Sequence, residues 1–244
     1  RVLMALGGST NAVVHLQALA GRLGLEIDLT TFDAISSEIP VLANLKPVGE
    51  YLMEDFFYAG GLPALLNEMS DLLYLDAVTV SGNTLGSNIV DSPNYNKDVI
   101  HSKDTALYNE GGLVVVKGNL APNGAIIKQA AASPDLLSHR GNAVVFDSLE
   151  EMESTIDDPD LDITAQDIIV MRNSGPIGGP GMPEWGDIPI PKKLLAKGVT
   201  DMVRISDARM SGTAFGTVII HVAPESAVCL LYTSPSPRDL STSR

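Results

Sequence analysis

Cysteine is almost absent from this chain, which has one, Cys229, among 244 residues. A disulfide scaffold needs several cysteines, so that class of protein is excluded. An iron–sulfur cluster and a structural zinc site also need several thiolates, and neither can be built from this chain alone.

Basic residues are also few. Lys and Arg number 16 against 30 Asp and Glu, and the formal net charge is −14. The summed field repels phosphate backbones and anionic lipid surfaces, so we expect neither nucleic acid nor a membrane as a partner. An anionic small substrate would need a local positive element, such as a bound metal ion or the N-terminus of a helix.

Long apolar runs are missing as well. No stretch reaches the roughly 18 apolar residues that a membrane span requires. Residues 1–4 lack the basic, apolar and small-residue regions of a signal peptide, so we expect a cytoplasmic protein. Because the chain has no initiating Met and an apolar run, Val2 to Leu6, is cut short at position 1, we expect the chain to begin inside a larger protein.

The hydrophobic content of 45% excludes disordered, collagen-like and coiled-coil classes and leaves a globular protein. The first 75 residues predict helical hairpins. Apolar residues over 11–23 recur near a period of 3.6, and Ser9 or Thr10 stands where an N-cap belongs. Further helices are predicted from Thr30, over residues 49–59 and over residues 63–73.

From about residue 100 the pattern changes to short β-branched runs separated by Gly, Asn and Pro, which predict six strands. Short helices are predicted after Ser148 and over residues 191–197, so the fold class is α/β rather than all-β. The predicted strands cover residues 113–117, 125–128, 143–146, 168–172, 202–205 and 217–222.

The polar stretch 87–97 shows no periodicity and predicts a domain boundary. We expect a mostly helical domain over residues 1–90 and a second domain over 98–228. Residues 229–244 are half Ser, Thr and Pro and predict a disordered tail unrelated to the rest.

Three Gly-containing polar turns could carry chemistry. The first, residues 7–11 (Gly-Gly-Ser-Thr-Asn), directly precedes the helix predicted over 11–23. Its N–H groups and hydroxyls could hold a carboxylate or phosphate at the positive end of the helix dipole. A plain N-cap is the alternative, because Ser or Thr before a helix is routine.

The second turn, residues 173–186, contains five Gly, three Pro and Glu184 after a predicted strand. Loops of this kind at strand ends often carry binding groups. A carboxylate there suits a hard cation such as Mg²⁺, and a solvated surface glutamate is the alternative.

The third turn, residues 204–216, lies between two predicted strands. Ser211 precedes Gly212, so a tight turn could present its Oγ to a cleft. No histidine stands at a recognisable spacing, so a hydrolase triad is weakly supported. We expect His221, inside an apolar strand, to be a core residue with its hydrogen bonds satisfied.

Six motifs stand in a fixed order along the chain, at residues 7–11, 80–86, 110–113, 117–122, 178–184 and 206–213. In this order they resemble the dihydroxy-acid dehydratase / 6-phosphogluconate dehydratase family, and the resemblance runs from residue 1 to about 228. Residues 183–185 and 206–213 look more like the pentonate (arabinonate or xylonate) dehydratase branch than the branched-chain amino-acid enzyme.

This resemblance implies a fold and a reaction. The fold is the end of a helical α/β cluster-binding domain followed by an incomplete, swivelling β-barrel-like domain with flanking helices. The reaction is a hydro-lyase step that converts a 2,3-dihydroxy sugar acid into a 2-keto-3-deoxy acid, with Mg²⁺ and an iron–sulfur cluster as cofactors. The implied roles are Ser211 as the base for the C2 proton, Thr213 as its neighbour, Glu184 as a Mg²⁺ ligand, and Ser9, Thr10 and Asn11 as substrate-facing residues.

The chain departs from the family at both ends. The cluster cysteines and the remaining Mg²⁺ ligands of the family lie upstream of residue 1, and its C-terminal domain continues past residue 228. We therefore expect this chain alone to be inactive and marginally folded, because an incomplete barrel exposes unpaired edges. The resemblance implies that the full-length protein forms a homodimer or a homotetramer.

Two other functions stay open. A dihydroxy-acid dehydratase of valine and isoleucine synthesis would need apolar walls for a branched alkyl group, whereas a sugar acid needs paired polar groups. A non-catalytic domain that binds a small acid or a partner protein is the alternative of another class.

Overall fold

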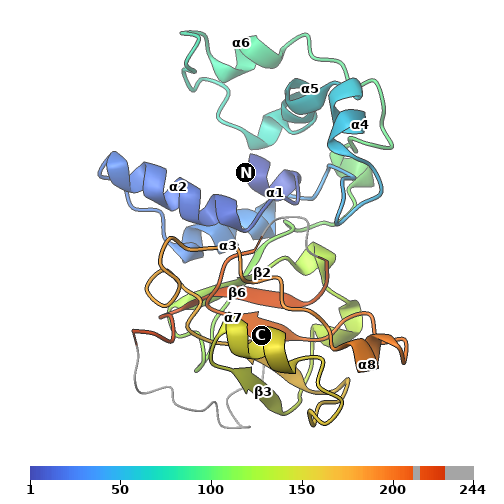
Figure 1. Ribbon diagram of the computed structural model, residues 1–244. Coiled ribbons are helices and arrows are strands. Elements are labelled where there is room, and N and C mark those ends of the chain that lie inside the picture. Colours follow the sequence, from blue (N-terminus) through green and yellow to red (C-terminus); the bar gives the residue numbers. More distant parts are fainter. Residues whose placement is uncertain (211–214, 229–244) are drawn as a thin grey trace.

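The computed structural model describes residues 1–210 and 215–228, and the predicted tail 229–244 lies outside them. Figure 1 shows α4, α5 and α6 at one end, the sheet at the other, and α1 to α3 between them. The α-helices are α1 (Val2–Ala5), α2 (Asn11–Arg22), α3 (Leu29–Glu38), α4 (Met53–Tyr58), α5 (Gly61–Glu68), α6 (Leu85–Ile89), α7 (Leu149–Thr155) and α8 (Lys192–Leu195). The 3₁₀ turns are η1 (Ser70–Leu72), η2 (Lys103–Thr105), η3 (Gln129–Ala131) and η4 (Pro134–Leu136).

The helix predicted over 11–23 is confirmed as α2. Thr10 occupies the N-cap position, but its side chain makes no capping hydrogen bond. The next helix, α3, has a side-chain cap, because Asp28 Oδ1 accepts a hydrogen bond of 2.8 Å from the Thr31 N–H. Among the described residues, no helix is long and apolar enough to cross a membrane.

Two helices start elsewhere than predicted, and the helix predicted over 63–73 ends at Glu68, before the 3₁₀ turn η1. The helix predicted over 49–59 begins later, at Met53, because the N–H of Glu50 donates to Asn44 Oδ1 at 2.9 Å and Asp55 accepts from the Leu52 N–H at 2.8 Å. These bonds form a turn and then an N-cap. The helix predicted from Pro63 begins two residues earlier, after Gly60, whose φ of 114° lets the chain reverse between α4 and α5.

Six strands form one sheet in the order β1-β2-β6-β5-β4-β3. The β1–β2 and β2–β6 pairs are antiparallel, and β6, β5, β4 and β3 run parallel. All six predicted strands are therefore confirmed, with β5 shifted toward the C-terminus. The strands are β1 (Val114–Val116), β2 (Gly124–Ile127), β3 (Ala143–Phe146), β4 (Ile168–Met171), β5 (Arg204–Ser206) and β6 (Val218–Ala223).

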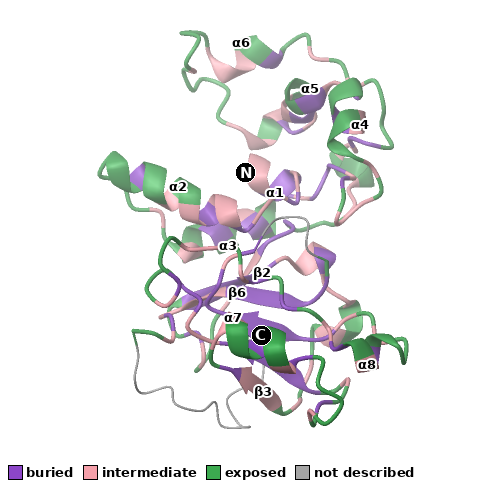
Figure 2. Cartoon of the chain, viewed as in Figure 1, coloured by how far each residue is buried: buried purple, intermediate pink, exposed green. Residues whose placement is uncertain are grey.

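The two faces of the sheet have separate cores. On one face, Phe146, Ile169 and Met171 pack with Met152 of α7 and Leu194 of α8. Figure 2 shows buried strands behind an α7 whose outward side is exposed. Ile127, Ile168, Ile205 and Ile219 belong to the cluster on the opposite face, where a hollow of about 380 Å³ lies.

The mixed α/β class is confirmed, whereas the barrel-like form is not. The sheet is open, because β1 and β3 lie at its two edges and do not pair with each other. Helix α6 also occupies the start of the polar stretch 87–97, where Thr84 Oγ1 caps the Ser87 N–H at 3.2 Å.

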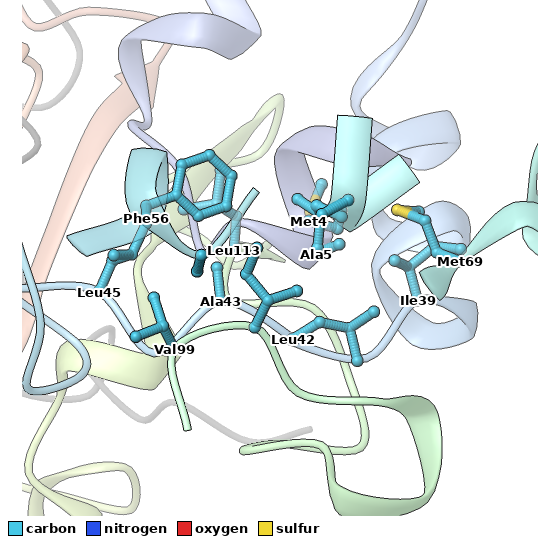
Figure 3. Close-up of a cluster of buried hydrophobic side chains, with 14 of the residues drawn as sticks. Met4, Ala5, Ile39, Leu42, Ala43, Leu45, Phe56, Met69, Val99 and Leu113 are labelled. Atoms are coloured by element: carbon cyan, nitrogen blue, oxygen red, sulfur yellow. The ribbon is translucent and has the colours of Figure 1, made fainter. Parts of the chain in front are cut away.

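A third core joins the helices to the sheet. Met4, Ala5 and Phe56 of the helices pack in it with Leu113 and with Ile126 of β2. Figure 3 shows part of this cluster, in which side chains from α1, α4 and the segments around residues 42 and 99 gather together. Val13 of α2 belongs to the same cluster as Ile126 of β2, and Figure 1 shows α2 lying above the sheet.

Candidate functional site

The carboxyl ends of three parallel strands meet at one edge of the sheet. Strand β4 leads into the Gly-rich loop 173–186, β5 into residues 207–210, and β6 into residues 224–228. In α/β sheets, ligands bind outside the carboxyl ends of parallel strands. Two of the three predicted polar turns thus begin at the same edge.

Glu184 is at the centre of the contacts that bring these turns together. Its Oε1 accepts a hydrogen bond of 3.0 Å from Asn11 Nδ2 and a charge-assisted one of 3.0 Å from Arg209 Nη1. The side chains of Glu184 and Arg209 are 42% and 28% exposed, so water reaches this ion pair. Its Oε2 accepts no hydrogen bond from any residue that the structure describes.

Asn11 reaches Glu184 from the first residue of α2. The turn before it is fixed locally, because Ser9 Oγ accepts a hydrogen bond of 3.2 Å from the Asn11 N–H. The amide oxygen, Oδ1, is buried and has no hydrogen-bond partner in the described part of the chain. A buried acceptor without a partner is costly, so this atom is suited to accept a hydrogen bond from a ligand or to bind a cation.

The other two residues of the predicted substrate-facing turn lie differently. Thr10, the N-cap residue of α2, is 5% exposed and therefore buried. Ser9 is half-buried, and its hydroxyl serves the Asn11 backbone. Of the three residues, only Asn11 contacts the predicted metal ligand among the described residues, whereas Ser9 holds the Asn11 backbone through a hydrogen bond.

Arg209 is a residue that the sequence reasoning did not single out. Its Nε donates to the Met182 carbonyl, its Nη1 donates to Glu184, and its own carbonyl accepts a hydrogen bond of 2.8 Å from the Gly186 N–H. Arg209 therefore ties both sides of Glu184 to the segment after β5. The sequence feature that could have identified Arg209 is its place as a basic residue two positions before Ser211 in a strongly acidic chain.

Ser211 and Thr213 lie outside the described residues, so the structure gives no position for either side chain. The described chain ends at Met210 on one side of them and resumes at Phe215 on the other. Arg209 is two residues before Ser211 and is in contact with Glu184.

His221 differs from its predicted environment. It lies in β6 with a φ of 55°, which non-glycine residues rarely adopt. Its Nε2 is buried and has no partner among the residues described, so the prediction of a satisfied core histidine is wrong. Burial, together with the positive charge of Arg209, lowers the pKa of His221 to about 4. The ring is therefore neutral at pH 7.

The donors at this site suit a hard cation in kind but not in number. Glu184 Oε2 and Asn11 Oδ1 are oxygen atoms, which Mg²⁺ prefers. Over residues 1–210 and 215–228, no three His, Cys, Asp or Glu side chains lie close enough together to hold a metal ion by themselves. A magnesium ion bound at Glu184 would need further ligands from elsewhere. No thiolate for an iron–sulfur cluster is present in the described chain, since the one cysteine is Cys229.

Two family models match the chain. The model described as dihydroxy-acid/6-phosphogluconate dehydratase N-terminal matches residues 1–88, and the corresponding C-terminal model matches residues 98–230. Together they cover almost the whole sequence.

Comparison of the chain with curated proteins also finds dehydratases. The chain is 53% identical over 226 residues to an L-arabinonate dehydratase of Rhizobium leguminosarum bv. trifolii, with 92% of this chain and 39% of the relative covered. It is 48% identical over 230 residues to a 6-deoxy-6-sulfo-D-gluconate dehydratase of Pseudomonas putida, with 93% and 40% covered. It is 44% identical over 227 residues to a dihydroxy-acid dehydratase of Caldicellulosiruptor bescii, with 92% and 40% covered. The chain thus spans about two fifths of the length of these relatives.

Proposed function

Because the chain belongs to the dihydroxy-acid/6-phosphogluconate dehydratase family, we propose that it is part of a hydro-lyase that converts a 2,3-dihydroxy sugar acid into a 2-keto-3-deoxy acid. The observation that supports this most directly is the contact of Asn11 and Arg209 with one oxygen of Glu184. This contact joins the three polar turns, of which the first is 173 positions from Glu184 in the sequence. It leaves two oxygen atoms, Glu184 Oε2 and Asn11 Oδ1, for a cation or substrate.

The proposed reaction removes one proton and one hydroxide. A base takes the proton from C2, the C–O bond at C3 breaks, and the resulting enol tautomerises to the 2-keto acid, so that one water is lost overall. We assign the base to Ser211, with Thr213 beside it. A serine hydroxyl is a weak base at neutral pH, so its anion needs positive charge and N–H dipoles nearby.

The described residues would supply part of that environment. Arg209 carries a positive charge two residues before Ser211, and Glu184 would hold a divalent cation through its Oε2. When bound, that cation would supply positive charge that stabilises the negative charge developing on the substrate. Asn11 would orient Glu184 and offer its Oδ1 to a hydroxyl of the substrate. Because this chain holds one cysteine, we assign none of its residues to an iron–sulfur cluster.

A sugar acid is favoured over a branched-chain dihydroxy acid as the substrate. The relatives named for sugar acids are 48% and 53% identical to the chain, and the dihydroxy-acid dehydratase is 44% identical. The donors and acceptors around Glu184 are also polar, as hydroxyl-rich substrates require. The branched-chain reaction is the second candidate.

The test is Ser211→Ala in the full-length enzyme that contains this chain. Formation of 2-keto acid is measured with a pentonate and with a branched dihydroxy acid. We expect the variant to lose turnover by about a thousandfold or more while it still binds substrate, as removal of a catalytic base does. The matched control is Ser154→Ala on the exposed side of α7.

The outcomes separate the candidate functions. Turnover of the pentonate alone supports the sugar-acid reaction, and turnover of the branched acid alone supports the second candidate. An unchanged rate in Ser211→Ala would exclude Ser211 as the base. An unmutated enzyme that binds the acids without dehydrating them would support a binding domain instead.

A further inference from the structure

Two buried acidic residues hold the start of the Gly-rich loop that carries Glu184. They are Asp207, after β5, and Glu225, after β6, and we call them the carboxylate clamp. Asp207 is 5% exposed and Glu225 is 8% exposed. Neither residue is among the candidate site residues that the sequence indicates.

Glu225 binds the backbone of the loop directly. Its Oε1 accepts hydrogen bonds from the N–H of Ile177 at 2.8 Å and of Gly178 at 2.9 Å, and its Oε2 lies 3.0 Å from the Ile177 nitrogen. These two N–H groups have no regular secondary structure to satisfy them, since this part of the loop is a turn. The carboxylate thus replaces the partners that a helix or strand would provide.

Asp207 binds the residues at the beginning of the same loop. Its Oδ1 accepts a hydrogen bond of 2.9 Å from the Ser174 N–H, and its Oδ2 accepts from both the N–H and the hydroxyl of Ser226. Ser226 in turn accepts a hydrogen bond of 2.7 Å from the Asn173 N–H. The ends of β4, β5 and β6 are therefore linked in one network.

No cation of the described residues neutralises either carboxylate, since no Lys, Arg or His among them forms an ion pair with Asp207 or Glu225. Their compensation comes from N–H and O–H donors, and a buried carboxylate is costly without such donors. Burying two carboxylates at one loop costs free energy, and this cost argues that the geometry which they hold is needed.

The loop also fits closely around Glu225. A Cβ added at Gly175 would lie 2.6 Å from Glu225 Oε2 and 2.8 Å from its Cβ, so no larger residue fits there without movement. Further along, the Gly179 N–H donates to the Gly175 carbonyl at 2.7 Å, and the ring of Trp185 lies against Gly179. Packed contacts thus lead from Glu225 to the residue next to Glu184.

We propose that Asp207 and Glu225 are positioning residues, which fix the backbone of residues 173–186 so that Glu184 stays beside Asn11 and Arg209. This inference deepens the proposed function, because it rests on Glu184 being a functional residue. The clamp itself contacts neither substrate nor metal. Its contribution is the order of the loop.

The single tryptophan of the chain, Trp185, reports on this order. The test compares Glu225→Ala, Glu225→Gln and the matched control Glu153→Gln, an exposed residue of α7, in the full 244-residue chain. Acrylamide quenching of Trp185 measures the exposure of the loop near Glu184. Hydrogen exchange by mass spectrometry measures the protection of the 173–186 amides, and circular dichroism checks the fold.

We expect Glu225→Ala to increase exchange of the loop amides by about tenfold or more, and quenching of Trp185 by roughly twofold, with little change in the amides of β3 and α7. Glu225→Gln keeps one acceptor oxygen, so it should restore most of the protection. The control should match the unmutated chain.

Three outcomes would overturn the proposal. They are unchanged loop exchange and quenching in Glu225→Ala, an equal rise in exchange across the whole sheet, and no difference between the Ala and Gln variants. If Glu225→Ala does not fold, Gly175→Ala crowds the same carboxylate from the other side and should loosen the same loop. None of these readouts depends on dehydratase turnover. The experiment can therefore disprove the positioning role of Asp207 and Glu225 independently of the proposed dehydratase function.

Discussion

Asn11 Nδ2 and Glu184 Oε1 lie 3.0 Å apart although 173 residues separate them in the sequence. Asn11 begins α2 in the helical half of the chain, and Glu184 belongs to a loop of the sheet half. The candidate site therefore forms where the two halves meet. Each half alone holds an incomplete set of polar groups.

This relationship leads to a prediction for Asn11. Asn11→Asp places a second carboxylate against Glu184 Oε1 and replaces a hydrogen bond with repulsion between like charges. In the full-length enzyme we expect the activating Mg²⁺ concentration to change by about tenfold, since an altered polar neighbour of a metal ligand changes metal affinity by that order. A magnesium titration of turnover measures the effect. Asn67→Asp, remote from the site, is the control and should leave the titration unchanged.

A second prediction concerns Arg209. Its guanidinium donates to Met182 and Glu184 at once, and a lysine ammonium lacks the planar geometry for both bonds. We expect Arg209→Lys to lower kcat/KM by about tenfold, the equivalent of one lost charge-assisted hydrogen bond. Steady-state kinetics of the full-length enzyme provide the measurement. Arg22→Lys, at the exposed end of α2, is the control, and equal effects of the two substitutions would contradict the assignment.

A third prediction concerns the stability of the sheet. Asp201 and Arg204 form a buried ion pair of 3.0 Å, and Asp201 also accepts from the Thr217 N–H at 2.9 Å. Removing one partner leaves the other charge buried, so Asp201→Ala should lower the free energy of unfolding by about 3 kcal/mol. Urea unfolding measures it. Asp158→Ala, at an exposed position, should change the free energy by less than about 0.5 kcal/mol.

The same pair gives a pH dependence. Burial raises the pKa of Asp201, but hydrogen bonds from Thr217 and Ser133 and the charge of Arg204 outweigh burial and lower it from 3.8. A carboxyl group with a lowered pKa stabilises the fold above its unfolded pKa and loses that contribution as the pH falls. The difference between the unmutated chain and Asp201→Ala should therefore shrink below about pH 4. A constant difference down to pH 2 would contradict this interpretation.

A fourth prediction concerns His221, whose pKa of about 4 is below the ordinary value of 6.5. The unfolded chain binds a proton at this residue between pH 6.5 and 4, whereas the folded chain does not, so His221 destabilises the fold as the pH falls. Asn also tolerates the positive φ at this position. We expect His221→Asn to reduce the acid-side slope of stability by up to about 1.4 kcal/mol per pH unit.

Urea unfolding at several pH values between 7 and 4 measures this slope. His15→Asn removes an exposed histidine and should keep the slope of the unmutated chain. Parallel slopes for His221→Asn and the unmutated chain would show that the buried ring does not determine the acid sensitivity.

The sheet was predictable because its strands are short β-branched runs between turn residues. Every residue of β4 is buried, so its sequence is a continuous apolar run. The start of α4 was not predictable, since Asn44 and Asp55 redirect the backbone through side-chain hydrogen bonds. Strand β5 begins after Met202 because the Met202 N–H donates to Asp201 instead, at 2.9 Å.

The candidate site was predictable only in part. Glu184 and the turn before α2 were recognised because their residue types and neighbours suggested chemistry. The contact between Asn11 and Glu184 depends on how α2 packs over the sheet, and no local pattern records that packing. Asp207 and Glu225 resemble ordinary surface acids in the sequence. Their burial follows from the convergence of three strand ends.

The core shown in Figure 3 also affects what happens when the backbone is cut. Val99 and Leu113 follow the polar stretch 87–97, yet they share an interior with Met4 and Phe56, which precede it. Proteolytic scission within that stretch would leave two fragments that each lack half of one hydrophobic interior. The fragments would remain associated after cleavage, and separate expression of either would expose the surface that the other covers.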